Sequence, residues 1–365
     1  MQIIKNKVTD SLPDYPIEKI APAKDILFMD IETTGFTART SNVYMIGCLG
    51  MEGDEWIATQ FFAERYSEEK EVIEAFFDYA SSYRCLIHFN GNNFDIPFLE
   101  AKCREFDLSY SFKDFTGIDI YRRIAPYRGF MNLENCKQKT VEHFLKIDRE
   151  DKYSGGDLVG VYHSFVEKPD DESMSLLLLH NFEDLKGMLR VLPVLAITDM
   201  FSEKLRVTKV LSNTYKDAHG EEHKELLMHF DLPSHFPVSF SSQFEKCYFA
   251  ASKNEALVRV PIYECELKYF YANYKDYYYL PDEDVALHKS VASFVDKNHR
   301  EPAKAANCYT KKEGTYLPEW DALVTPFFKK EYTSKELFFE LTEKRRTDRE
   351  LFSAYVSHIL EHMVV

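Results

Sequence analysis

The feature that most constrains the fold is the alternation of short apolar runs with segments of helical periodicity between residues 26 and 200. Three apolar runs follow one another through short connections, and a fourth comes after a helical segment: DILFMDIE, NVYMIGCLGM, EWIATQFFA and YRCLIHFN. Short connections predict an antiparallel meander, and helices between later strands are typical of α/β layers. We therefore expect an α/β fold with a mixed sheet flanked by helices.

The chain changes character near residue 205. Runs rich in Val, Phe and Tyr follow, which predict a smaller β-rich region: LRVTKVLSN, LLMHFDLP, KCYFAAS, ALVRVPIY and ELKYFYANY. Helical segments are expected after it, over 282–295, 334–343 and 346–363. Because 365 residues exceed what one core usually organises, we predict two domains, 1–204 and 205–365.

Composition limits the cellular compartment and the kinds of binding partner that we expect for the protein. Seven cysteines without a C-x-x-C pair argue against a disulfide framework and a structural zinc site, and they favour a reducing cytoplasm. No apolar run approaches the roughly 18 residues of a membrane span, so we expect no membrane partner. The net charge of −15 weakens long-range attraction to phosphate, but it permits a local basic track or metal-bridged phosphate binding.

Two carboxylates stand side by side where the first apolar run ends, in Asp30-Ile31-Glu32-Thr33-Thr34-Gly35. Strand side chains alternate, so Asp30 and Glu32 share one face and Ile31 points to the other. Like charges repel at that distance, which points to a hard cation such as Mg²⁺ or Mn²⁺. The alternative is a strand that leaves the core into a polar turn, with both acids solvated.

Further polar groups follow later apolar elements. Asp95 lies after the fourth run, in HFNGNNFDIPFL, where it could be a ligand or simply cap a helix. His180 and Asp184 lie one helical turn apart in the apolar helix LLLLHNFEDLKGML, a polar pair that is unfavourable to bury without partners. A buried histidine satisfied by its neighbours is the alternative for His180.

The order of these motifs, D-x-E-T-T-G, then F-N-x-x-x-F-D, then H-N-x-x-D, resembles the DEDD 3′–5′ exonuclease superfamily, and most nearly its YprB-type ribonuclease H-like proteins. The resemblance covers about residues 25–200 and implies a ribonuclease H-like fold. It places Asp30, Glu32, Asp95 and Asp184 at the metal-binding positions and His180 at the general-base position. His180 precedes Asp184 by four positions, whereas the common His-type members have five. Asp119 matches no catalytic position and is expected to be structural.

The resemblance implies a metal-dependent 3′–5′ exonuclease acting on single-stranded DNA or RNA with two Mg²⁺ or Mn²⁺ ions. His180 would take a proton from the attacking water. The backbone around Thr33, Thr34 and Gly35 and the side chain of Asn90 are candidates for substrate contacts, although asparagines also form turns. A non-catalytic nucleic-acid-binding or scaffold module that retains the fold is the alternative function.

Residues 205–365 resemble no family that we can name. Their basic-aromatic stretch from Arg300 to Tyr316, which includes Lys311 and Lys312, could follow a single strand, since aromatic rings stack on bases and cations on phosphates. Packing in a β-rich core is the alternative for the tyrosines. The role of this region and any protein partners stay open.

Overall fold

The structure is a computed structural model that describes residues 1–9, 14–150, 153 and 155–364. It divides into two compact units: Met1–Asp199 with Ser234–Val238, and Met200–Pro233 with Ser239–Val365. Among the described residues, no helix is long and apolar enough to cross a bilayer.

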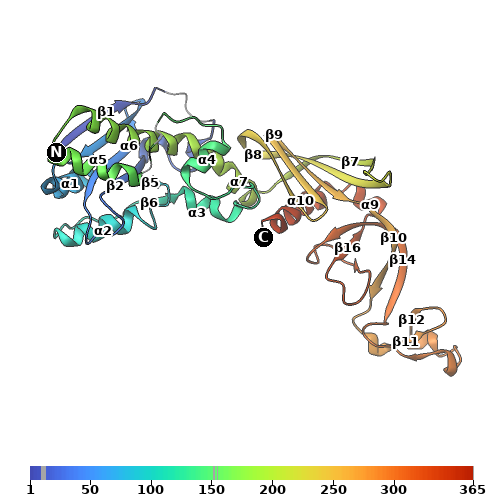
Figure 1. Cartoon of the computed structure of the whole chain (residues 1–365). Helices are drawn as coiled ribbons and strands as arrows, with labels where there is room; N and C mark the ends of the chain where they lie inside the picture. Colours follow the sequence, from blue (N-terminus) through green and yellow to red (C-terminus); the bar gives the residue numbers. More distant parts are fainter. Residues whose placement is uncertain (10–13, 151–152, 154, 365) are drawn as a thin grey trace. The chain divides into compact units, whose positions relative to one another are not determined.

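The first unit is built on a six-stranded sheet of order β1-β4-β3-β2-β5-β6 (Figure 1). Its strands are β1 (Gln2–Lys7), β2 (Ile26–Thr33), β3 (Val43–Glu52), β4 (Glu55–Phe62), β5 (Cys85–His88) and β6 (Thr116–Asp119). The predicted meander is confirmed, because β2, β3 and β4 pair antiparallel. β5 lies parallel to β2, and β6 lies parallel to β5. The sheet is therefore mixed, as expected.

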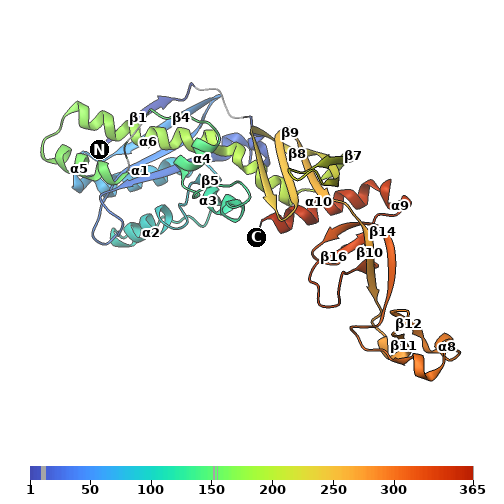
Figure 2. The same ribbon diagram turned by 45° about the vertical axis from the view of Figure 1, so that its right-hand side comes forward.

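Helices cover both faces of this sheet, and α6 crosses one of them (Figure 2). The helices of this part of the chain are α1 (Glu69–Ala80), α2 (Asp95–Glu105), α3 (Ile120–Ile124), α4 (Gln138–Phe144), α5 (Gly155–Glu167), α6 (Asp171–Val191) and α7 (Ala196–Ser202). One core joins β2 to α1 and α2, and a second joins β3 and β4 to α5 and α6. The predicted ribonuclease H-like α/β arrangement is confirmed.

Strand alternation in β2 sorts its side chains between these two faces. Leu27, Met29 and Ile31 are buried in the core with α1 and α2. Asp30 and Glu32 alternate with them, so they point to the opposite face, where α6 packs on β2. The strand therefore directs its apolar residues to one helix pair and its two acids to α6.

The second unit contains three small sheets, of orders β7-β8-β9, β10-β14-β16-β15 and β12-β11-β13. Their strands are β7 (Arg206–Lys216), β8 (Glu222–Phe244), β9 (Cys247–Pro261), β10 (Tyr263–Phe270), β11 (Tyr277–Leu280), β12 (Val285–His288), β13 (Glu301–Pro302), β14 (Tyr309–Glu319), β15 (Phe327–Phe328) and β16 (Leu337–Glu340). The helices are α8 (Lys289–Ala292), α9 (Glu343–Arg346) and α10 (Arg349–Met363), and α10 packs against β7. The predicted β-rich character is confirmed.

Two of the expected helices in this unit are wrong in part or whole. Residues 285–288 form β12, because Asp284, with a φ of 50°, turns the chain back so that it pairs with β11. Residues 337–340 form β16, where Phe338 and Phe339 pair with β14 and β15. Aromatic residues fit a half-buried strand better than a helix face, and sheet packing decides here.

The cations and rings of the basic-aromatic stretch have partners within the second unit. Lys311 pairs with Asp284 at 2.5 Å, and Lys312 pairs with Glu340 at 2.7 Å. Tyrosine rings gather around a small buried cluster, and Tyr271 stacks on Tyr277 with ring centroids 4.6 Å apart. Both lysines are thus engaged by carboxylates of their own unit.

Candidate metal centre

Helix α6 approaches the sheet closely over β3, and glycine permits this. Gly47 lies beside Asp30 in the β2–β3 register. A Cβ at Gly47 would stand 1.9 Å from Oδ1 of Asn181, so the helix side chain occupies the space that a larger residue would fill. The contact brings the 180–184 turn of α6 against the face of β2 that bears its acids.

Three predicted site residues meet at this contact. Oxygen and nitrogen atoms of Glu32, His180 and Asp184 lie within 4.8 Å of one another. Nε2 of His180 is 3.4 Å from Oδ2 of Asp184 and 3.8 Å from Oε1 of Glu32. Glu32 and His180 are buried. Two carboxylates and an imidazole so placed could share one cation.

Asp30 lies next to this group and interacts with the other acids. Burial raises its pKa well above the usual range, and Asp184, Glu32 and Asp95 raise it further. Nδ2 of Asn181 donates to Oδ2 of Asp30 at 3.0 Å, which lowers the pKa in part. The repulsion that the D-x-E motif predicts is thus present.

Asp95 joins the site through the backbone of β2. It is the first residue of α2, and its Oδ1 accepts a hydrogen bond from the Ile31 amide, between the two β2 acids, at 3.2 Å. Burial raises its pKa to about 7, the backbone hydrogen bonds lower it, and Asp119 and Asp184 raise it. The alternative of a side-chain cap does not describe Asp95, because Phe94 is the N-cap and no side-chain cap bond forms there.

The four candidate substrate contacts have structural roles of their own. The Thr33 hydroxyl donates to the Gly35 carbonyl, and the Thr34 hydroxyl accepts from the Asn42 amide. A Cβ at Gly35 would stand 2.6 Å from Oγ of Ser41, so a side chain there would displace the Ser41 hydroxyl. Asn90 has a φ of 66°, a turn conformation, and is half-buried.

Asp119 organises the loop that precedes Asp95. It is buried, and its carboxylate accepts hydrogen bonds from the backbone amides of Asn90, Asn92 and Arg122. It also N-caps α3. The structural role expected for Asp119 matches these contacts.

Three further residues of the site were not anticipated from the sequence. Asn181 bonds to Asp30 and also accepts from Nε2 of Gln60 on β4 at 3.1 Å. Arg149, in the segment between α4 and α5, donates to Asp184. Asn181 was visible as the residue after His180, and Gly47 in an apolar strand was a sign of close packing. Arg149 carries no such signal.

The chemistry of these donors fits hard divalent cations. Carboxylate oxygens are the ligands that Mg²⁺ prefers, and Mn²⁺ accepts both carboxylates and imidazole. Burial and neighbouring acids raise the pKa values of Asp30 and Asp95, and bound cations would oppose that effect. Asp30, Glu32, Asp95 and Asp184 are therefore the residues that could hold the ions.

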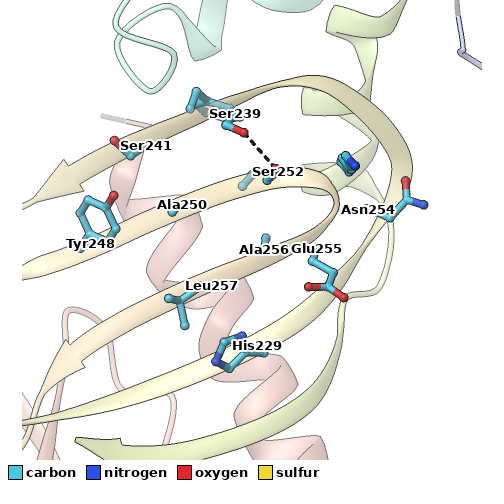
Figure 3. Close-up of a pocket in the computed structure, with 13 residues that line it drawn as sticks. His229, Ser239, Ser241, Tyr248, Ala250, Ser252, Asn254, Glu255, Ala256 and Leu257 are labelled. Atoms are coloured by element: carbon cyan, nitrogen blue, oxygen red, sulfur yellow. Dashed lines mark hydrogen bonds between the residues drawn. The ribbon is translucent and has the colours of Figure 1, made fainter.

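A concavity lies in the second unit and differs in chemistry from the candidate metal centre. It has a volume of about 870 Å³ and lies along the β8–β9 hairpin, where Ser239 bonds to Ser252 (Figure 3). Its lining includes small and hydroxyl side chains together with His229 and Glu255. It offers no group of metal-ligating side chains among the residues the structure describes.

Residues 27–196 match the RNase_H superfamily. That span contains Asp30, Glu32, Asp95, His180 and Asp184, so the matched segment and the candidate metal centre coincide. No curated protein sequence matches the chain.

Two solved structures are partly similar to the chain. A family B DNA polymerase from Pyrobaculum calidifontis is 16% identical, with 49% of this chain and 26% of that chain covered and a TM-score of 0.39. Exonuclease I of E. coli in complex with a dT13 oligonucleotide is 10% identical, with 57% and 55% covered and a TM-score of 0.31. The chain thus spans from a quarter to about half of these proteins, and likenesses of this level say nothing about its substrate.

Proposed function

We propose that the protein is a metal-dependent nuclease that cleaves single-stranded DNA or RNA from the 3′ end, related to the YprB-type ribonuclease H-like proteins. The observation that supports this most is the meeting of Glu32, His180 and Asp184 within 4.8 Å, next to Asp30 and Asp95. The two acids of β2 face the turn of α6 that bears His180 and Asp184, and Asp95 at the start of α2 bonds to the β2 backbone between those two acids. A fold without chemistry to perform would gain nothing from such repulsion.

Each residue has a role in this proposal. Asp30, Glu32, Asp95 and Asp184 hold two divalent cations. When bound, the cations supply an acidified water and charge stabilisation at the leaving 3′ oxygen. Nε2 of His180 would take the proton of the attacking water as a general base. Asn181 fixes the rotamer of Asp30 through its 3.0 Å hydrogen bond.

Contacts to the terminal nucleotide are proposed for the turn that follows the acids. The Thr33–Gly35 backbone lies directly after Glu32, so a scissile phosphate at the metals would bring the nucleotide over this turn. Asn90, held by Asp119 through its amide, would contact the sugar or the phosphate of the same strand.

The experiment that tests the function is digestion of single-stranded DNA and RNA labelled at either end, with Mg²⁺, Mn²⁺ or EDTA. We expect 5′-labelled strands to shorten stepwise and 3′-labelled strands to release a labelled mononucleotide. Asp30→Asn should abolish cleavage, whereas Glu55→Gln removes an exposed carboxylate from the start of β4 and should not. Binding of the strands without metal-dependent cleavage would favour the non-catalytic binding module instead.

A further inference from the structure

A buried network lies behind Asp184, on the side away from His180. Oδ1 of Asp184 accepts from Nη2 of Arg149 at 2.7 Å. Nη1 of Arg149 donates to both oxygens of Glu142 on α4, at 3.1 and 3.2 Å. The Glu142 side chain is 1% exposed and that of Arg149 is 9% exposed. One guanidinium thus joins the buried carboxylate of Glu142 to the half-buried carboxylate of Asp184.

The position of Glu142 is itself fixed by α6. Nε2 of Gln138 donates to Oε1 of Glu142 and to the carbonyl of Asp184, each at 2.9 Å. A Cβ at Gly187 would stand 2.2 Å from Oε1 of Glu142, so glycine is required where α4 lies over α6. Glu142 on α4 therefore holds Arg149 in place, and Arg149 in turn contacts the Asp184 carboxylate on α6.

The two oxygens of Asp184 consequently face different partners. Oδ1 is engaged by the guanidinium, and Oδ2 lies 3.4 Å from Nε2 of His180, on the side of Glu32. The charge-assisted hydrogen bond from the guanidinium holds Oδ1 on the side of Arg149. Only Oδ2 remains directed at the metal centre.

We propose that Arg149, anchored by Glu142, is a positioning residue that makes Asp184 a ligand through one oxygen only. The proposal rests on the proposed function for its catalytic consequence, but its effect on metal binding stands apart from any activity. Arg149 also places a fixed positive charge next to a metal ligand. It therefore orients Asp184 for cleavage while it limits the attraction of the site for cations.

A purely structural role for Arg149 predicts a different result for its substitution. If the arginine only anchored the segment between α4 and α5, its loss would loosen the site, and metal affinity, activity and stability would fall together. A positioning role separates these quantities. Removal frees Oδ1 and takes away a competing positive charge, so metal should bind more tightly while turnover falls.

The test compares Arg149→Met and Arg149→Lys with the wild type in two assays on the whole chain. Mn²⁺ affinity is measured by titration with detection by electron paramagnetic resonance. The rate is measured by steady-state cleavage of a labelled strand. Arg190→Met is the matched control, because the Arg190 guanidinium also holds this segment, through the Asp148 carbonyl at 3.1 Å. Glu142→Gln leaves Arg149 in place but weakens its anchor. Thermal unfolding of each variant measures the structural contribution.

We expect Arg149→Met to bind Mn²⁺ more tightly than the wild type and to lose about 10–100-fold in kcat, the usual effect of removing a partner of a metal ligand. In both Mn²⁺ affinity and kcat, Arg149→Lys and Glu142→Gln should fall between the wild type and Arg149→Met. Arg190→Met should resemble the wild type in both. Weaker Mn²⁺ binding in Arg149→Met, or an unchanged kcat, would overturn the proposal. If the wild type cleaves no nucleic acid, the proposed function fails, and tighter Mn²⁺ binding would still support the positioning of Asp184.

Discussion

Asn181 and Asp30 lie 151 residues apart in the sequence and are joined by a hydrogen bond of 3.0 Å, from Nδ2 to Oδ2. Oδ1 of Asn181 accepts from Gln60, and its position requires glycine at residue 47. The amide therefore presents its donor to the acid and its acceptor to the sheet. This contact lies where α6 approaches the sheet, and it lowers the pKa of Asp30 against the burial and the neighbouring acids that raise it.

Loss of this hydrogen bond should move the pH dependence of cleavage. Because the Asn181 amide lowers the pKa of Asp30, Asn181→Ala should raise that pKa further. The acid limb of the kcat/KM profile should then move to higher pH, with activity falling most below neutrality. Asn93→Ala changes an exposed asparagine of the same unit and should leave the limb in place. A shift to lower pH in Asn181→Ala would contradict this assignment.

Removal of metal should expose an unusual dependence of stability on pH. Burial raises the pKa of Asp95 to about 7 and raises that of Asp30, both above the value near 3.9 of an unfolded chain. The folded state therefore binds these protons more tightly than the unfolded chain does. The stabilisation of the folded state by the two protonated acids is complete below pH 4 and is lost as pH rises toward 7. For Asp95 the loss is on the order of 4 kcal/mol.

Urea unfolding of the EDTA-treated protein between pH 4 and 8 measures this effect. The comparison with Asp95→Asn isolates the group, since that variant has no proton to lose and should show a flatter profile. Added Mn²⁺ should restore stability at pH 8 in the wild type more than in the variant. Parallel profiles for the two proteins would show that Asp95 is not strongly perturbed.

His180 should contribute to the rate far more than to folding. If its imidazole takes the proton of the attacking water, His180→Ala should reduce kcat by about 10²–10⁴-fold. Thermal unfolding should change much less, and His163→Ala, at an exposed position on α5, should be near wild type in both. A large loss of stability with a modest loss of rate would instead identify a histidine satisfied within the core.

Close packing at Gly47 should be essential to the site. A Cβ there would overlap the Asn181 amide at 1.9 Å, so Gly47→Ala should displace α6 or turn Asn181 away from Asp30. We expect a loss of about 1–3 kcal/mol in stability, together with loss of cleavage. At Gly117 in β6 a Cβ would meet nothing within 4 Å, which makes Gly117→Ala the control. Equal behaviour of the two variants would contradict the packing at Gly47.

The sequence was most informative where local periodicity and chemistry agree. Alternation in β2 predicted that Asp30 and Glu32 share a face, and the spacing of His180 and Asp184 predicted one helical turn. Sequence could not predict the contacts that cross between elements. Arg149 lies in a connection without periodicity, and its role depends on Glu142 and Asp184 reaching it from two helices.

In the second unit, local pattern was a poorer guide. Residues 282–295 have apolar spacing compatible with a helix, but the turn at Asp284 and pairing with β11 make part of them a strand. The lysines that suggested a nucleic-acid track are paired with Asp284 and Glu340, acids far from them in the sequence. Tertiary pairing therefore decided both features, and composition alone could not reveal it.

The most direct measurement is anomalous diffraction at the manganese edge from crystals of the protein soaked in Mn²⁺. We predict two anomalous peaks within coordination distance of the carboxylate oxygens of Asp30, Glu32, Asp95 and Asp184, and their loss in Asp30→Asn crystals. Crystals that hold Mn²⁺ elsewhere, or hold none at these acids, would contradict the central claim that they form a metal centre.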